Sequence, residues 1–269
     1  MDDGAHMEAD DGARTGAGDV RARPRAVTER LRDDLIFGTW PPGERLRPQS
    51  LRERYDTTSG TLREALIRLG GEGLVDVEEQ RGFSTIRPTP ETFHEVRHLR
   101  LVLECEGARL AIRNGDLEWE ADLAAAHHRL AHIEQRMRGA DDIREHIQMW
   151  SRHDQAFHIA LMAACGSDLL MREHARIYER FRMHVVAELR DWGFRGALNV
   201  EEHGAILAAA LDRDAQSCCD ALDAHLAIYR SRENPPRDPF DGRLDGPPNG
   251  AGPNGTGPDG TGPDGTGKD

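Results

Sequence analysis

The feature that most constrains this fold is the long run of helical spacing between residues 89 and 235. Apolar residues recur there every three to four positions, which places them along one side of a helix. This stretch of sequence contains no segment in which apolar and polar residues alternate as they do in a strand. The pattern predicts that residues 89–235 fold as an all-α helical bundle.

Short clusters of turn-forming residues divide this region into separate helices. The first helix is expected to begin at Pro90, because proline is favoured in the first turn of a helix. Four or five further helices should follow it. The expected breaks lie at residues 115–116, 139–140, 166–167, 193–197 and 212–214.

Residues 25–88 predict a second domain of a different kind. Helical spacing over residues 25–38 ends at Gly38, and a P-P-G turn follows. A short second helix comes next, with Ser50 as its expected N-cap and Glu53 at the capping-box position.

A polar turn at residues 56–60 leads to a third helix, expected over residues 61–71. Two strands follow at residues 74–79 and 83–86, and they are joined by a turn at residues 80–82. The order helix, helix-turn-helix and β-hairpin predicts a winged helix-turn-helix domain, a fold that places its third helix in the major groove of DNA.

The two ends of the chain are expected to be disordered tails. Residues 1–24 hold almost no large apolar side chain, and residues 236–269 repeat the turn-forming sequence G-T-G-P-D. The predicted fold class is therefore mainly α, with an N-terminal winged helix-turn-helix domain at 25–88 and a C-terminal all-α helical bundle at 89–235.

The net charge of −13 argues at first against a nucleic-acid partner. The charge is unevenly distributed, because residues 25–88 contain 11 arginines and 11 acidic residues and are neutral as a whole. A neutral domain can still bind phosphate when its arginines are gathered on one face, and the acidic remainder would discourage non-specific DNA contacts.

The four cysteines show no metal-binding or redox spacing, and a chain of this length does not depend on disulfides. We therefore expect reduced thiols in the core. The sequence shows no signal-peptide pattern and no apolar run of about 18 residues. A cytoplasmic location without membrane contact is expected.

Asp154 and His158 are the clearest candidates for a metal site. They lie four residues apart in a predicted helix, so that a carboxylate and an imidazole share one face. The apolar residues around them predict that this face is buried, and a buried carboxylate beside an imidazole needs a partner such as a metal ion. His203 and His225 lie on two further predicted helices. One oxygen and three nitrogen donors suit Zn, Ni, Fe or Mn. The alternative is four unrelated polar residues, because the chain has 13 histidines.

The chain resembles a known family in two segments that cover about residues 26–232. The first segment resembles the GntR family of bacterial transcription regulators, in I-F-G-T-W-P-P-G-E-R-L, T-L-R-E-A-L-I-R-L-G-G-E-G-L-V and R-G-F-S-T-I. The helical region resembles the FCD ligand-binding domain of the FadR subfamily, in R-L-V-L-E, D-x-x-x-H, E-H-x-x-I-L-x-A-A-L-D-R-D and H-L.

The resemblance implies a homodimer that binds a pseudo-palindromic double-stranded DNA operator and responds to a small organic acid. It also implies a divalent metal ion (Zn, Ni or Mn) on Asp154, His158, His203 and His225. Comparing the effector response of metal-loaded and metal-free protein would distinguish a sensing metal from a purely structural one.

Within a winged helix-turn-helix frame, the expected DNA contacts come from the recognition helix, the residue before the second helix and the tip of the wing. These residues are Arg47, Thr58, Ser59, Thr61, Arg63, Arg81 and Gly82. Many members of the family have Ser-Arg where this chain has Thr58 and Ser59, and some have an arginine where it has Gln49. The operator sequence of the family is therefore not carried over.

Two roles are open for Arg100. It lies four residues before Glu104, so the two could form an ordinary ion pair on a solvated helix face. The resemblance instead implies that Arg100 anchors the carboxylate of the effector, because a guanidinium group binds carboxylates through two parallel hydrogen bonds.

An enzyme is the competing function. An Asp/His₃ metal site could activate water for hydrolysis, with Glu201 or Glu202 as general base. Acidic residues in the first turn of a helix are common for electrostatic reasons, and a simple hydrolase has no use for a DNA-reading domain. We therefore expect a ligand-responsive transcription regulator and no enzymatic activity.

Overall fold

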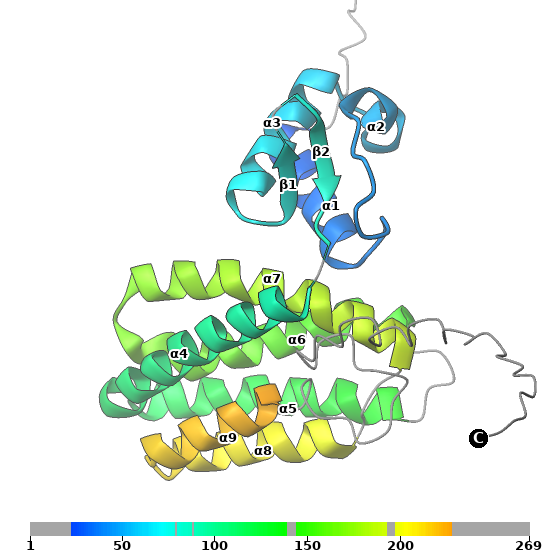
Figure 1. The fold of residues 1–269 in the computed structure, drawn as a ribbon. Coiled ribbons are helices and arrows are strands. Elements are labelled where there is room, and N and C mark those ends of the chain that lie inside the picture. Colours follow the sequence, from blue (N-terminus) through cyan, green and yellow to red (C-terminus); the bar gives the residue numbers. More distant parts are fainter. Residues whose placement is uncertain (1–22, 79, 88, 139–143, 193–196, 228–269) are drawn as a thin grey trace, which may run out of the picture.

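The computed structural model of the chain describes residues 23–78, 80–87, 89–138, 144–192 and 197–227. The tails predicted at 1–24 and 236–269 therefore lie almost entirely outside the described residues, as do the helix breaks predicted at 139–140 and, apart from its last residue, at 193–197. Within the described residues, a small N-terminal domain sits on a larger bundle of helices (Figure 1).

The N-terminal domain has the order that the sequence predicts. Its elements are α1 (Pro24–Ile36), α2 (Pro48–Tyr55), α3 (Ser59–Gly71), β1 (Val75–Glu78) and β2 (Gly82–Thr85). The apolar faces of these elements meet in one core, which contains the fully buried Leu31, Tyr55 and Leu66. The winged helix-turn-helix prediction is confirmed, and we refer to this domain as the head.

The predicted start of α2 is three residues late and that of α3 is two residues late. Ser50 is not an N-cap, because α2 already begins at Pro48 and the Ser50 hydroxyl donates a hydrogen bond to the carbonyl of Arg47. Proline fits the first helical position, where no backbone N–H is needed. Similarly, α3 begins at Ser59, and Thr58 caps it by accepting a hydrogen bond from the Thr61 amide.

The wing is an antiparallel hairpin in which Val75 pairs with Thr85 and Glu78 pairs with Gly82. Gly82 has φ of +91°, a backbone conformation that favours glycine at the tip of the hairpin. A bridge between Arg45 and Ser84 ties the segment before α2 to the wing.

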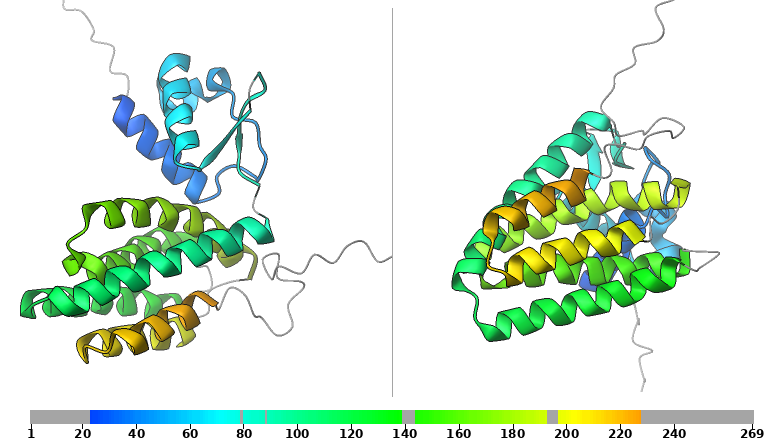
Figure 2. Two further views of the ribbon diagram at one scale, coloured as in Figure 1. Left: turned by 60° about the vertical axis from the view of Figure 1, so that its left-hand side comes forward. Right: turned by 90° about the horizontal axis from the view of Figure 1, so that it is seen from below.

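The second unit is a bundle of long helices, which we call the body (Figure 2). Its elements are α4 (Pro90–Asn114), α5 (Leu117–Arg138), α6 (Arg144–Met162), the 3₁₀ turn η1 (Ala163–Cys165), α7 (Asp168–Trp192), α8 (Ala197–Leu211) and α9 (Ala215–Ala227). The described part of the body contains no strand, so the all-α prediction is confirmed.

The core of the body runs the length of the bundle and is rich in aromatic side chains. Trp150 and Phe157 of α6 are fully buried, and Phe93 of α4 stacks on Phe181 of α7 with ring centres 5.6 Å apart. Helices α4, α6, α7, α8 and α9 all meet around the middle of this core. Side chains from helices that are distant in the sequence therefore come together there.

Helix α7 connects the body to the head. Arg32 of α1 forms ion pairs with Glu72 at the end of α3 and with Glu179 of α7. Met183, one turn after Glu179, packs against the apolar core of the head. The head therefore rests on one face of α7.

All four cysteines are buried free thiols, as the sequence predicts. No helix within the described ranges is both long and apolar enough to cross a membrane.

Candidate functional site

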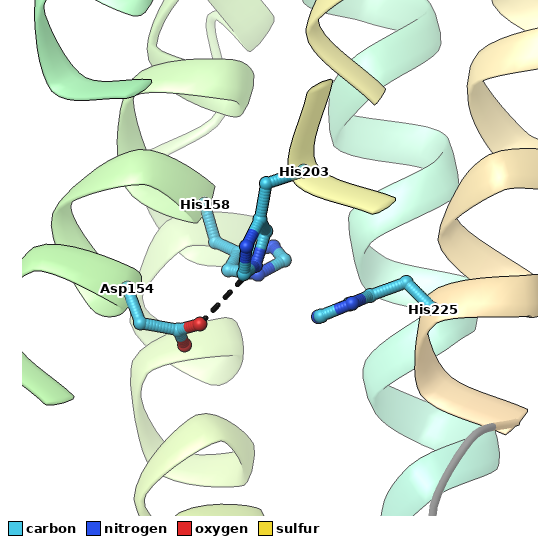
Figure 3. Close-up of side chains that lie close together, drawn as sticks. All are labelled: Asp154, His158, His203 and His225. Carbon is cyan, nitrogen blue, oxygen red and sulfur yellow. Dashed lines mark ion pairs between the residues drawn. The ribbon is translucent and has the colours of Figure 1, made fainter. Parts of the chain in front are cut away.

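The four predicted metal ligands meet in the middle of the body. Asp154 and His158 are one turn apart on α6, His203 comes from α8 and His225 comes from α9 (Figure 3). One donor atom from each residue lies within 4.8 Å of the others, and all four side chains are buried. The structure therefore brings together four residues that are spread over 72 positions of the sequence.

The donor atoms suit a metal ion. Nε2 of His158 is buried and has no hydrogen-bond partner among the described residues. Nε2 of His203 lies 3.3 Å from Oδ1 of Asp154. A buried polar atom without a partner costs free energy, and a cation held by these nitrogens and the carboxylate would remove that cost. Three imidazoles and one carboxylate are a common ligand set for Zn, Ni and Mn.

A glutamate lies next to Nδ1 of each of the three histidines. Glu104 of α4 is 3.1 Å from His158, Glu134 of α5 is 3.0 Å from His203, and Glu202 of α8 is 3.1 Å from His225. The contact at His225 has the geometry of a hydrogen bond, whereas the other two are short but poorly aligned. We refer to these residues as the three outer glutamates.

The second oxygen of Asp154 is held by α7. Both the hydroxyl group of Tyr178 and the guanidinium group of Arg182 donate hydrogen bonds to Oδ2 of Asp154. Burial by itself would raise the pKa of Asp154, but the positive charge of Arg182 holds it well below the usual range. The carboxylate is therefore charged and oriented, with Oδ1 directed toward His203.

The outer carboxylates also change the protonation of the site. Burial by itself would lower the pKa of His203, but hydrogen bonds and charge interactions with Asp154 and Glu134 raise it to about 9. Burial lowers the pKa of His225 well below its usual range. Burial would likewise raise the pKa of Glu104, but Arg100 and His158 hold it well below its usual range.

Arg100 lies beside this centre and is 1% exposed. Its Nε donates a 2.7 Å hydrogen bond to Glu104, which is itself fully buried. The reading of this pair as an ion pair on a solvated face is therefore wrong. Nη2 of Arg100 is buried without a hydrogen-bond partner in the described part of the chain. The guanidinium group lies over the ring of Tyr178, at 4.7 Å.

The remaining histidines are not part of the metal cluster. His153 is the neighbour of Asp154 but is only partly buried and lies outside the cluster. His184 of α7 is buried, with 5% of its surface exposed, and its ring lies 5.2 Å from that of Phe93. Burial lowers the pKa of His184 to about 4.

The head carries a second candidate site, a groove of about 470 Å³ between α3, the start of α2 and the wing. Five of the seven residues expected to contact DNA line this groove: Arg47, Ser59, Arg63, Arg81 and Gly82. Arg45 and Gln49 also line it, and sequence reasoning did not assign them to DNA. The groove therefore gathers four arginines next to the N-terminal end of α3.

Thr58 and Thr61, the other two expected DNA contacts, have local roles in the structure. The hydroxyl groups of these threonines lie 3.1 Å apart, and that of Thr58 also accepts from the Thr61 amide. Both side chains are partly buried at the start of α3. Arg45 could have been found from the sequence only by knowing that residues 43–46 run beside the wing, because it lies outside the helix-turn-helix motif.

A winged helix-turn-helix head joined to an all-α helical body with a buried cluster of one carboxylate and three imidazoles is typical of a class of DNA-binding transcription regulators. The chain belongs to the gntR family of bacterial regulatory proteins, whose family model matches residues 24–84. The FCD domain model matches residues 95–228. The head is thus a DNA-binding domain and the body an FCD effector-binding domain.

Curated relatives match most of the chain. The chain is 37% identical over 217 residues to BphR of Paraburkholderia xenovorans, an uncharacterized HTH-type transcriptional regulator, with 77% of this chain and 83% of the relative covered. It is 32% identical over 203 residues to GlaR, an HTH-type transcriptional repressor of Escherichia coli, with 73% and 89% covered.

Solved structures share the fold. McbR/YncC of E. coli superposes with a TM-score of 0.63 at 20% identity and covers 76% of this chain and 92% of its own. A GntR regulator from Rhodococcus sp. RHA1 has a TM-score of 0.61 at 24% identity, with 76% and 93% covered.

These comparisons decide between the regulator and the enzyme. The matched family and its relatives are transcription regulators, which confirms the expectation that this protein is not an enzyme. The structure also removes Glu202 from the role of general base, because its carboxylate is engaged with His225. Glu201 is exposed on α8, as a residue near a helix start commonly is.

Proposed function

We propose that this transcription regulator holds one divalent metal ion (Zn, Ni or Mn) on Asp154, His158, His203 and His225, and uses it to sense a small carboxylate. In this proposal residues 25–88 read DNA and residues 89–235 bind metal and effector. The observation that carries the proposal is the convergence of four buried donors within 4.8 Å in a body attached to a DNA-binding head.

The metal ion would supply a Lewis-acid centre to which a carboxylate binds, since four protein ligands leave coordination positions free for Zn, Ni or Mn. The ionised Asp154 would give the site one negative charge, and the three imidazoles would give neutral nitrogen donors. Tyr178 and Arg182 would keep Asp154 in place by holding its outer oxygen.

Arg100 is the proposed anchor of the effector carboxylate. It is buried, stacks on Tyr178, and keeps Nη2 available while its Nε is bound to Glu104. Arg182 lies one turn after Tyr178 on α7, with its guanidinium group 4.9 Å from the ring centre. Nη2 of the buried Arg100, together with the bound metal ion, would favour an anionic ligand over a neutral or cationic one.

Helix α7 gives a physical connection between effector and DNA. His174, Tyr178 and Arg182 recur every four residues and face the site, whereas Glu179 and Met183 contact the head. A ligand that favours one position of α7 would therefore shift the head relative to the body. Such a shift requires that the ligand bind the two arrangements with different affinity.

The proposed DNA contacts are Arg47, Thr58, Ser59, Thr61, Arg63, Arg81 and Gly82. The groove in the head supports five of them directly.

We further propose a homodimer, because two heads are needed to read the two halves of a pseudo-palindromic operator. Leu99 and Val102, one turn apart on α4, are each about half exposed and offer an apolar area for such a contact. The relative GlaR is named a repressor, and we propose that this protein is a repressor as well.

The test uses DNA selected by the protein from random sequence. We expect that some member of a panel of small mono- and dicarboxylic acids changes the affinity of Zn²⁺-loaded protein for this DNA by at least about fivefold. Metal-free protein and the Arg100→Lys variant should respond much less. An equal response with and without metal would assign the metal a purely structural role.

A further inference from the structure

We propose that Glu104, Glu134 and Glu202 form an outer ring of carboxylates that fixes the tautomer of His158, His203 and His225 so that each presents Nε2 to the metal. The three are positioning residues and not ligands. This inference rests on the proposed metal site and extends it to residues that come from α4, α5 and α8.

The Nδ1–carboxylate distance is nearly the same at all three histidines although the helices differ, and at His225 the contact also has the geometry of a hydrogen bond. The Nδ1–carboxylate distances are 3.1, 3.0 and 3.1 Å for His158, His203 and His225. Glu104 and Glu134 are fully buried, and the Glu202 side chain is 15% exposed. Three glutamates placed in one pattern by three helices are not explained by the solvation of a surface.

Two of the outer glutamates are themselves held by further contacts. Glu104 accepts hydrogen bonds from Arg100 and, at 2.8 Å, from Nε2 of His174. Glu134 accepts a 3.2 Å hydrogen bond from the indole N–H of Trp150. Each fixed carboxylate therefore determines where the neighbouring imidazole directs its N–H.

A carboxylate has a specific effect on a neutral imidazole because it only accepts hydrogen bonds. It favours the tautomer with hydrogen on Nδ1, which leaves the lone pair of Nε2 for a metal ion. A glutamine of the same shape would also donate an N–H to Nδ1. It would thereby permit the tautomer with hydrogen on Nε2, in which that nitrogen has no lone pair free for the metal ion.

The charge of the outer ring of carboxylates also matches that of a divalent metal ion. Asp154 and the three outer glutamates are four carboxylates, whereas Arg100 and Arg182 supply two guanidinium groups at the same centre. One divalent cation bound by neutral imidazoles would balance the remaining two negative charges. The ring therefore favours a divalent over a monovalent cation.

Two adjacent glutamates of α8 provide a matched test. Glu202 contacts His225, whereas Glu201 is exposed, so Glu202→Gln and Glu201→Gln make the same chemical change on one helix. Zn²⁺ affinity is measured on the full chain by competition with a chelator. We expect Glu202→Gln to weaken Zn²⁺ binding by about 10–100-fold, and Glu201→Gln to leave it within about twofold of the wild type.

The tautomer itself is measured by long-range ¹H–¹⁵N NMR of the metal-free protein labelled at histidine. We expect His225 to carry its hydrogen on Nδ1 in the wild type and in Glu201→Gln, and to populate the Nε2–H tautomer in Glu202→Gln. A general loss of stability would not change the tautomer of one ring, so this measurement separates positioning from a structural role.

The outcomes are distinguishable. If the wild type binds no Zn²⁺, Ni²⁺ or Mn²⁺, both the proposed metal site and the outer ring are wrong. If the wild type binds Zn²⁺ and Glu202→Gln binds it equally well with an unchanged His225 tautomer, the metal site stands and the positioning role is wrong.

Discussion

Arg32 of the head is ion-paired with Glu179 of the body, and Glu179 directly follows Tyr178, whose hydroxyl group binds the candidate metal ligand Asp154. The two neighbours on α7 point in different directions, one toward the DNA-binding domain and one toward the buried centre. A small rotation or translation of α7 would therefore affect both sites together.

Glu179→Gln should weaken communication between the two sites without affecting metal affinity. The substitution keeps the shape of the side chain but removes the charge that pairs with Arg32. We expect Zn²⁺ to slow amide hydrogen exchange in α1 of the wild type by at least about fivefold, and to have a smaller effect in the variant.

The control for this experiment lies on the same helix. Glu173→Gln removes an exposed ion pair with Arg176, 3.2 Å away within α7, and should behave as the wild type. Equal protection of α1 by Zn²⁺ in all three proteins would show that the Arg32–Glu179 contact does not transmit binding.

Arg63→Ala should weaken binding to selected DNA by about 10–100-fold, the loss expected for an arginine that reads a base. Arg63 is exposed, lines the groove of the head and lies 5.9 Å over the ring of Phe83. The measurement is fluorescence anisotropy at a fixed salt concentration, together with circular dichroism to verify the fold.

Arg68→Ala is the matched control, because Arg68 is exposed in the last turn of α3 and is not among the residues that line the groove. Its affinity for DNA should stay within about threefold of the wild type. If the two variants lost affinity equally, the groove would not be the DNA-reading surface.

His184 should make the body less stable in weak acid. Its pKa is about 4 in the folded protein and about 6.5 in an unfolded chain, mainly because burial disfavours the charged ring, with a smaller effect of Arg180. Its contribution to stability is therefore complete above pH 6.5 and falls as the pH drops toward 4. A shift of this size corresponds to about 3 kcal/mol.

The measurement is urea unfolding of wild type and His184→Phe between pH 7 and pH 4.5. Protonation of the other histidines destabilises both proteins and cancels in the comparison. We expect the wild type to lose about 2–3 kcal/mol more than the variant over this range. Parallel pH dependence in the two proteins would contradict the buried, neutral state of His184.

The sequence predicted the order of elements well because its signals are local. Proline at position 90, helical spacing and short turn clusters depend on neighbours in the chain, and the structure confirms each within the described residues. The start of α2 was displaced because a serine at the third helical position resembles an N-cap in sequence. The deciding residue was Pro48, which begins the helix.

The residues of the candidate site were likewise predictable from the sequence only where their signal is local. Asp154 and His158 share a helix face and could be paired from their spacing, whereas His203 and His225 were grouped with them through a family resemblance. The three outer glutamates had no sequence signal as a set, because each glutamate lies on a different helix from the histidine that it contacts. The burial of the Arg100–Glu104 pair likewise depends on packing by α7.

The most direct test of the account is the metal content of purified, untagged protein, measured by elemental mass spectrometry on the wild type, His203→Ala and His153→Ala. His153 is adjacent to Asp154 but outside the cluster, so it controls for loss of a histidine. We predict about one divalent metal ion per chain in the wild type and His153→Ala, and almost none in His203→Ala. Wild-type protein without metal after dialysis against Zn²⁺, Ni²⁺ and Mn²⁺, or unchanged content in His203→Ala, would contradict the metal centre.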